Sequence, residues 1–450
     1  MILSAYIGNE RIGRLADSPA VAGRILFEYD AAWRRKGIEL SPFHLPTSLA
    51  GPTFFDSEFP QVKNLPGLMW DSLPDSWGMP LLERRLREAE HDPAKATGTV
   101  FLSHVGHRGM GAIRYEPDHA GGAEHRMLTS LRRLDDEASR VQQDQAPADF
   151  QSIHDLIQTG SAIGGAKPKA AVYIDLATDR VSVSPDAGFE PWVVKLSTVP
   201  AEHKDSRQAG RVEYAVSNMA RAAGIQMPET RIFPVKYSKG ERGLFGIKRF
   251  DRNAGVSRVH VQTYAALRHI IPVRGAGSYE MMAQDVLALS GDQRDVAELF
   301  RRGVFNVLSG NRDDHLKNFS FLMDGDWRWR LAPAYDITPS PGPQSLHERV
   351  SARQCTAMNG TLSPALDDML ACAEAMDLDG PKIIREVQSA LSGWMGFAQQ
   401  AGLKASVAEK VKDGFRIERP ARKAGKPKEQ LLSAPRAAAC GSRGRSDPGR

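Results

Sequence analysis

The stretches SGNRDDHLKNFSFLM (309–323) and AYDITPS (334–340) carry the strongest structural signal in the chain. Asp313 and Asn318 are five residues apart, which is the spacing of loops where the aspartate accepts a hydroxyl proton and the asparagine holds Mg²⁺. Asp336, one predicted hairpin later, could add a second metal carboxylate, because a hard cation takes oxygen ligands from several segments. A lone aspartate is more often a turn or cap residue. Together, these residues predict a phosphoryl-transfer site.

A glycine-rich segment, TGSAIGGAKPKAAVYI (159–174), lies upstream of this site. At Gly164 and Gly165 backbone amides could approach a triphosphate, and Lys167 and Lys169 follow before a predicted strand. The segment matches neither the P-loop nor the GxGxxG pattern, so a plain glycine turn between two elements is the alternative interpretation.

The strand-like sequence WVVKL (192–196) contains a lysine, Lys195, that points away from the face of Trp192. A lysine in so apolar a strand needs an anionic partner if it faces a cleft. Glu213, on the predicted helix 211–225, could orient it. The alternatives are a solvent-facing lysine on an edge strand and an exposed glutamate.

The composition is that of a globular protein with two or three domains: 450 residues, 41% apolar and 25% charged. No apolar run of about 18 residues occurs, and the N-terminus lacks the pattern of a secretory signal. We therefore expect a cytoplasmic protein without membrane association. The 3 cysteines are widely spaced, which argues against a disulfide framework or a zinc site.

The net charge of +5 is concentrated near the C-terminus. Residues 421–450 carry eight Lys or Arg against Glu429 and Asp447, a net of +6 that leaves about −1 for the rest. This segment is rich in Gly, Pro, Ser and Arg and has no apolar period, so it is predicted to be disordered. A nucleic-acid-binding arm is the alternative interpretation.

Local patterns predict a mixed lobe followed by a helical lobe, an α+β bilobal arrangement. The stretches 6–15 and 23–33 look like strands of a small antiparallel sheet, and a helix is expected around Met79, Leu82 and Leu86. Further strands are predicted at 170–176, 192–196, 231–235 and 244–250, helices at 211–225, 295–310 and 364–379, and a hairpin at 319–331. The expected parts are an N-terminal subdomain (1–132), a polar linker (133–150), a nucleotide-binding part (151–280), a mainly helical catalytic lobe (281–415) and a basic disordered tail (416–450).

The ordered motifs SLPDSWG, GGAKPK, VVKL, IKRFDR, DDHLKNFS and LAPAYDI resemble those of the HipA family of type II toxin–antitoxin kinases. The resemblance runs from about Tyr6 to Gln400. It implies a protein-kinase-like core of the HipA fold with a small N-terminal β-containing subdomain. It also implies a serine/threonine-protein kinase that uses ATP and Mg²⁺.

The resemblance also implies residue roles, with Asp313 as the catalytic base. Nucleotide contacts are implied for Gly164, Gly165, Ala166, Lys167, Pro168, Lys169 and Lys195 at the phosphates, for Lys248, Arg249 and Phe250 at a hinge, and for His315, Leu316, Lys317, Asn318, Tyr335 and Asp336, of which Asn318 and Asp336 would hold the metal.

Two positions depart from the family pattern. Ala162 stands where the family has an autophosphorylated serine, with Ser161 one residue earlier. Asp314 follows the expected base, and adjacent carboxylates raise each other's pKa unless a metal offsets the repulsion.

The partners implied by the resemblance are a HipB-like helix-turn-helix antitoxin, operator DNA bound mainly through that antitoxin, and a protein substrate. Relatives act on translation components such as aminoacyl-tRNA synthetases, but no residue here selects one. One alternative is a catalytically silent corepressor acting with a DNA-binding antitoxin. The presence of Lys195, Asp313, Asn318 and Asp336 argues against it. The other alternative is a kinase for a small molecule or lipid.

Overall fold

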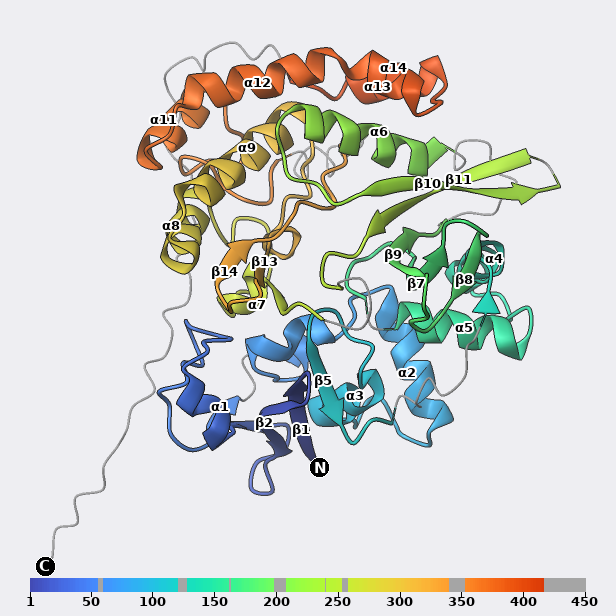
Figure 1. Cartoon of the computed structure of the whole chain (residues 1–450), viewed down its shortest axis with the longest axis vertical. Helices are drawn as coiled ribbons and strands as arrows, with labels where there is room; N and C mark the ends of the chain where they lie inside the picture. Colours follow the sequence, from blue (N-terminus) through green and yellow to red (C-terminus); the bar gives the residue numbers. More distant parts are fainter. Residues whose placement is uncertain are drawn as a thin grey trace, which may run out of the picture.

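The structure is a computed structural model that describes residues 1–55, 60–119, 128–161, 163–197, 208–238, 240–252, 258–339 and 353–416. In Figure 1 the N-terminal region lies at the bottom, a second sheet lies to the right, and the C-terminal helices lie along the top. No helix in these ranges is both long enough and apolar enough to span a bilayer.

The N-terminal region is built on an antiparallel sheet with the strand order β4-β3-β2-β1-β5 among the described residues. Its strands alternate buried and exposed side chains, as expected for a sheet with one face against the core. The elements are β1 (Ile2–Ile7), β2 (Glu10–Asp17), β3 (Ile25–Tyr29), α1 (Ala31–Lys36), β4 (Thr53–Phe55), η1 (Pro60–Val62), η2 (Gly67–Ser72), α2 (Gly78–Glu88), α3 (Gly98–Val105) and β5 (Ile113–Glu116).

A second antiparallel sheet has the strand order β10-β11-β9-β7-β8-β6 in the described part. Helices α4 and α5 cover one face and share an apolar cluster with β7 and β9, whereas α6 packs on β10 and β11 (Figure 1). The elements are β6 (Leu128–Thr129), α4 (Leu131–Gln142), α5 (Phe150–Gly160), β7 (Lys169–Asp175), β8 (Arg180–Ser182), β9 (Glu190–Lys195), α6 (Ala209–Ala222), β10 (Thr230–Tyr237) and β11 (Gly240–Lys248).

The remaining lobe is mainly helical and carries one small antiparallel sheet, β12-β13-β14, in its described residues. The long helix α9 is mostly buried, because α8 and α12 pack against it. The elements are β12 (Val261–Thr263), α7 (Tyr264–Leu267), α8 (Tyr279–Ser290), α9 (Gln293–Ser309), η4 (Leu316–Asn318), β13 (Ser320–Met323), β14 (Trp329–Leu331), α11 (Leu366–Ala375), α12 (Gly380–Ser392), α13 (Trp394–Gln400) and α14 (Ala405–Lys412).

These elements confirm the predicted mixed lobe and helical lobe, with two local corrections. The strand expected over 23–33 ends at Tyr29, because the Asp30 side chain caps helix α1 by accepting the N–H of Ala32. In the linker expected over 133–150, residues 133–142 form the larger part of helix α4. Its Asp135 and Glu137 are fully buried, whereas Arg132, Arg133 and Asp136 are exposed, so only part of this polar sequence faces solvent.

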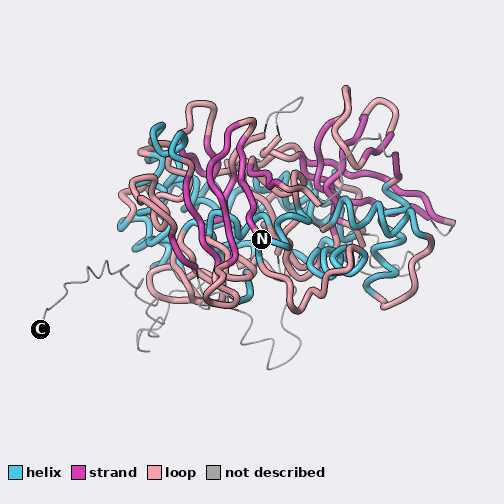
Figure 2. Tube along the Cα trace, turned by 90° about the horizontal axis from the view of Figure 1, so that it is seen from below, coloured by secondary structure: helices cyan, strands magenta, loops and turns pink. Residues whose placement is uncertain are grey.

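The apolar core connects the N-terminal sheet to the helical lobe, since one cluster of buried side chains includes residues of both. Trp77 and Leu81 instead join the cluster beneath the second sheet. The N-terminal region therefore packs against both lobes, and Figure 2 shows the strands of the sheets spread across the width of the molecule. This packing brings the SLPDSWG segment to the predicted nucleotide site.

Candidate functional site

Lys195 lies at the centre of the site and joins three distant segments. It ends strand β9 on the face opposite the buried Trp192 and Val194, as the sequence predicts. Its Nζ forms an ion pair with Glu213 on α6 and another with Asp336 Oδ1 at 2.6 Å. Burial alone would lower the pKa of Lys195, but the two carboxylates outweigh it and raise the pKa. The lysine is therefore a permanent cation in the site.

Asp336 is held in a conformation that few residues adopt. Its φ is +53°, in the left-handed region that is uncommon outside glycine and is often found at functional sites. Lys195 keeps the pKa of Asp336 well below its ordinary value, although burial opposes this, and Lys169 adds to the effect. An ionised carboxylate thus faces the two lysines.

The glycine loop between α5 and β7 lies over Lys169. Gly165 has φ +102°, and a Cβ at this position would lie only 2.1 Å from Lys169 Nζ. Lys169 is 8% exposed, and burial lowers its pKa. Ala166 and Lys167 are exposed, and the carbonyl of Pro168 accepts the N–H of Leu196 at 2.8 Å. Close approach of a buried lysine to a backbone loop is an arrangement suited to phosphate oxygens.

Asp75, from the SLPDSWG segment, reaches this loop and was not among the predicted site residues. Its Oδ2 accepts the N–H of Gly165 at 2.7 Å, and its Oδ1 pairs with Lys317 Nζ. Because these partners are 90 and 242 residues away in sequence, spacing alone gives no signal for the contact. The motif SLPDSWG marked the segment but not its role.

The predicted catalytic loop places Asp313 at the surface, with its side chain 69% exposed. Asn318 Nδ2 donates to the carbonyl of Asp313 at 2.6 Å, which closes the loop. Asn311 Oδ1 accepts the N–H of Asp313 at 3.2 Å, and His315 Nε2 is 3.9 Å from Asp313 Oδ1. The two hydrogen bonds fix the backbone of Asp313, and its exposed carboxylate can be reached from solvent.

Asp314 points the other way and is fully buried. Its carboxylate accepts the N–H of Cys355 at 2.6 Å, the hydroxyl of Tyr279 at 2.9 Å and the Nε2 of Gln354 at 3.2 Å. Burial raises the pKa of Asp314 despite these bonds. The two adjacent carboxylates therefore point in opposite directions: Asp313 faces solvent, and Asp314 anchors the loop from inside the protein.

At the predicted hinge, the backbone N–H groups of Lys248 and Arg249 already donate hydrogen bonds within the protein. The N–H of Lys248 donates to the carbonyl of Glu229 and that of Arg249 to the carbonyl of Pro191, both at 2.9 Å. The Arg249 side chain is buried against Asp251, with Nη2 2.8 Å from Oδ2. These two N–H groups and this guanidinium are therefore not available to an adenine ring, whereas Phe250 stacks on Tyr335 with ring centroids 6.2 Å apart.

Other predicted residues divide between the site and the core. The hydroxyl of Tyr335 donates to the carbonyl of Lys317 at 2.7 Å, which joins two predicted segments. Leu316 is 2% exposed, and its side chain belongs to the apolar core. Ala162 lies outside the described residues. Ser161 is fully buried and its N–H bonds the carbonyl of Ile157, so a phosphate there would require the end of α5 to open.

The predicted metal ligands fit a magnesium ion of the nucleotide-bound kind. Among the described residues, no group of three or more His, Cys, Asp or Glu side chains could hold a metal by itself. Mg²⁺ commonly takes one or two protein oxygens together with substrate phosphates and water. The ionised Asp336 and the amide oxygen of Asn318 are oxygen donors of this type.

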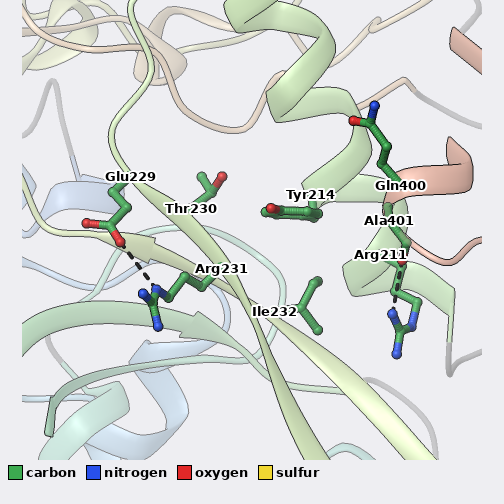
Figure 3. A pocket seen from close by; sticks show the side chains of 8 residues that line it. All are labelled: Arg211, Tyr214, Glu229, Thr230, Arg231, Ile232, Gln400 and Ala401. Atoms are coloured by element: carbon green, nitrogen blue, oxygen red, sulfur yellow. Dashed lines mark hydrogen bonds and ion pairs between the residues drawn. The ribbon is translucent and has the colours of Figure 1, made fainter. Parts of the chain in front are cut away.

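A separate pocket of about 440 Å³ lies where α6, β10 and the end of α13 meet. Figure 3 shows its polar lining, in which Arg231 pairs with Glu229 and Arg211 donates to the carbonyl of Ala401. None of the predicted site residues lines it.

Two family models match most of the chain, apart from residues 117–160 and the chain ends. Residues 3–116 match the HipA N-terminal domain and residues 161–412 match the HipA-like C-terminal domain. The chain belongs to the HipA family. The fold is similar to that of HipA from Shewanella oneidensis MR-1, solved in a toxin–antitoxin complex with HipB and operator DNA. The two chains superpose with a TM-score of 0.63 at 17% sequence identity, over 92% of this chain and 94% of that chain. This likeness confirms the predicted HipA fold.

The curated relatives that match parts of this chain include proteins named as kinases. "Putative kinase Y4dM" of Sinorhizobium fredii is 33% identical over 156 residues, 32% of this chain and 36% of that protein. "Putative kinase" of Haemophilus influenzae is 26% identical over 263 residues, 53% of this chain and 74% of that protein. The match to the first relative thus spans about a third of its length.

Proposed function

We propose that this HipA-family chain is an ATP-dependent serine/threonine-protein kinase. The observation that carries the proposal is the bonding of Lys195 to both Glu213 and Asp336. Kinases require a strand lysine paired with a helix glutamate, and an aspartate at the metal, at the same time. Here these groups come from β9, α6 and the segment after β14, and the glycine loop lies next to them.

In the proposed reaction, each residue has one role. Lys195 and Lys169 bind phosphate oxygens, and the amides of the glycine loop lie over them. Asp336 and Asn318 would hold Mg²⁺, which supplies charge that offsets the phosphates. Asp313 accepts the proton of a serine or threonine hydroxyl as that oxygen attacks the γ-phosphorus and ADP leaves. The exposure of Asp313 suits a protein substrate, because a polypeptide must reach it from outside.

The proposal includes a toxin role with a HipB-like antitoxin as partner and operator DNA bound mainly through that antitoxin. It rests on family membership and on the Shewanella oneidensis complex that contains HipA, HipB and operator DNA. Co-expression with the candidate antitoxin should relieve growth arrest and give a stable complex on purification. Growth arrest that persists with the antitoxin present would contradict this part.

The activity is tested with γ-labelled ATP, Mg²⁺ and a cell lysate, followed by mass spectrometry of labelled proteins. Wild type should label serine or threonine. Asp313→Asn should reduce transfer by about 10²-fold or more, the usual scale of general-base effects, while ATP binding stays nearly intact. Asp326→Asn, at an exposed hairpin position, is the matched control. Label transfer at the wild-type rate by Asp313→Asn would remove this residue from the mechanism.

The same assay separates the alternatives. Wild-type chain that binds ATP but labels no protein, lipid or metabolite would support the silent corepressor. Label found only on a small molecule or lipid would identify a different acceptor class with the same ATP site.

A further inference from the structure

Asp75 bridges the two sides of the candidate nucleotide site. Its Oδ2 accepts the N–H of Gly165, in the glycine loop, at 2.7 Å, and its Oδ1 pairs with Lys317, in the catalytic loop. The two donors belong to different lobes, and each is a group that can bind phosphate. One carboxylate therefore fixes their separation.

The backbone that carries Asp75 is itself held in place. The carbonyl of Asp75 accepts the N–H of Met79 at 2.8 Å, and the indole of Trp77 donates to the carbonyl of Lys169 at 3.1 Å. A Cβ on Gly78 would lie 2.6 Å from the carbonyl oxygen of Gly160, so the helix start sits directly against the chain that leads into the glycine loop. The Asp75 backbone is thus held next to both ends of the glycine loop, at Gly160 and at Lys169.

Asp75 is charged in this position. Burial would raise its pKa, but Lys317 and the N–H of Gly165 outweigh burial and lower the pKa. Asp71, the residue just before the SLPDSWG segment, has other partners: its carboxylate accepts the N–H of Thr263 at 2.6 Å and the hydroxyl of Thr263 at 2.9 Å. The segment is thus tied to the helical lobe on one side and to the glycine loop on the other.

We propose that Asp75 is a positioning residue of the kinase site: it sets the distance between Gly165 and Lys317 and thereby shapes the phosphate-binding part of the nucleotide site. This inference rests on the proposed function. It makes the N-terminal region a contributor to nucleotide binding and not only a neighbour of the core.

The first test is hydrogen exchange of the ligand-free full chain, read at the amide of Gly165. Asp75→Ala should speed this exchange, because the amide loses its acceptor, whereas Asp75→Asn should retain part of the protection through its carbonyl oxygen. Asp92→Asn is the matched control, since Asp92 lies in the same region and is half exposed. Equal protection of Gly165 in wild type and Asp75→Ala would overturn the proposal.

The second test is Mg·ATP binding by calorimetry, together with kcat and KM for label transfer. Asp75→Ala should weaken Mg·ATP binding about tenfold or more, the scale of a lost charge-assisted hydrogen bond. KM for ATP should rise more than kcat falls. Unchanged affinity with only a lower Tm would mean a merely structural role, and tighter binding would mean that Asp75 competes with phosphate. Either result overturns the proposal.

A double-mutant cycle covers the case in which Asp75→Ala does not fold. In a Lys317→Met background, Asp75→Asn should weaken Mg·ATP binding less than it does in wild type, because one of its two partners is already missing. Additive effects would overturn the proposed coupling. Wild type that fails to bind Mg·ATP would refute the proposed function itself, a result distinct from any difference among these variants.

Discussion

Substitutions at the two adjacent aspartates of the catalytic loop should affect different properties, activity at Asp313 and stability at Asp314. Asp313 is 69% exposed and Asp314 is fully buried, although they are neighbours in sequence. Asp313→Asn should reduce phosphoryl transfer and leave the free energy of unfolding unchanged. Asp314→Ala should lower the free energy of unfolding, and any loss of activity should follow from the loosened loop.

The magnitude for Asp314→Ala comes from the donors it leaves behind. The N–H of Cys355, the hydroxyl of Tyr279 and the Nε2 of Gln354 would lose their shared acceptor inside the protein. At about 1 kcal/mol for each net hydrogen bond, the loss is about 3 kcal/mol. Asp314→Asn keeps one acceptor oxygen and should cost less, because only the donors that face its NH₂ group lose their acceptor.

Urea denaturation measures the effect as a shift of the unfolding midpoint at constant slope. Wild type, Asp313→Asn, Asp314→Asn and Asp314→Ala should be compared at pH 7, with label transfer assayed on the same samples. A loss below about 1 kcal/mol in Asp314→Ala would refute the anchoring role, since no single buried hydrogen bond would then have been lost. Equal destabilisation by Asp313→Asn would refute the contrast.

Two further predictions concern stability. Asp251→Asn should destabilise the chain by about 3 to 5 kcal/mol, measured by urea denaturation, because it leaves two buried guanidinium groups without their carboxylate; a change under about 1 kcal/mol would contradict this. Stability should also fall as pH decreases from about 6.5 to 4, by roughly 2 kcal/mol at pH 5 for each of His104 and His260. Burial lowers the pKa of each to about 4, so the unfolded chain takes up the proton first. Equal urea midpoints at pH 7 and pH 5 would contradict this, and His260→Gln should flatten the dependence.

Sequence patterns predicted the parts of the site that depend on local order. The lysine at the end of β9 stood out in an apolar strand, the glutamate on α6 was a candidate partner for it, and the aspartate followed a predicted hairpin. The structure brings all three together. What a nucleotide would contact there remains a prediction.

Features that depend on distant contacts were not predictable in this way. Asp75 looks like a turn residue until the fold places it between Gly165 and Lys317. Likewise, the sequence of helix α4 is polar, yet Asp135 is buried because it bonds to Arg242 and Tyr237, which lie more than a hundred residues away. A hydropathy pattern records the polarity of a side chain but not the partner that lets it be buried.

The docking of the SLPDSWG segment has a consequence for how such chains can be recombined. The indole of Trp77 meets the backbone of Lys169, Gly78 leaves no room for a side chain, and Asp251 accepts the N–H of Gly111. A chimaera that joins the N-terminal region of one relative to the core of another would need compatible residues at all of these contacts. We therefore expect an exchanged N-terminal region to dock only where the residues at these contacts match.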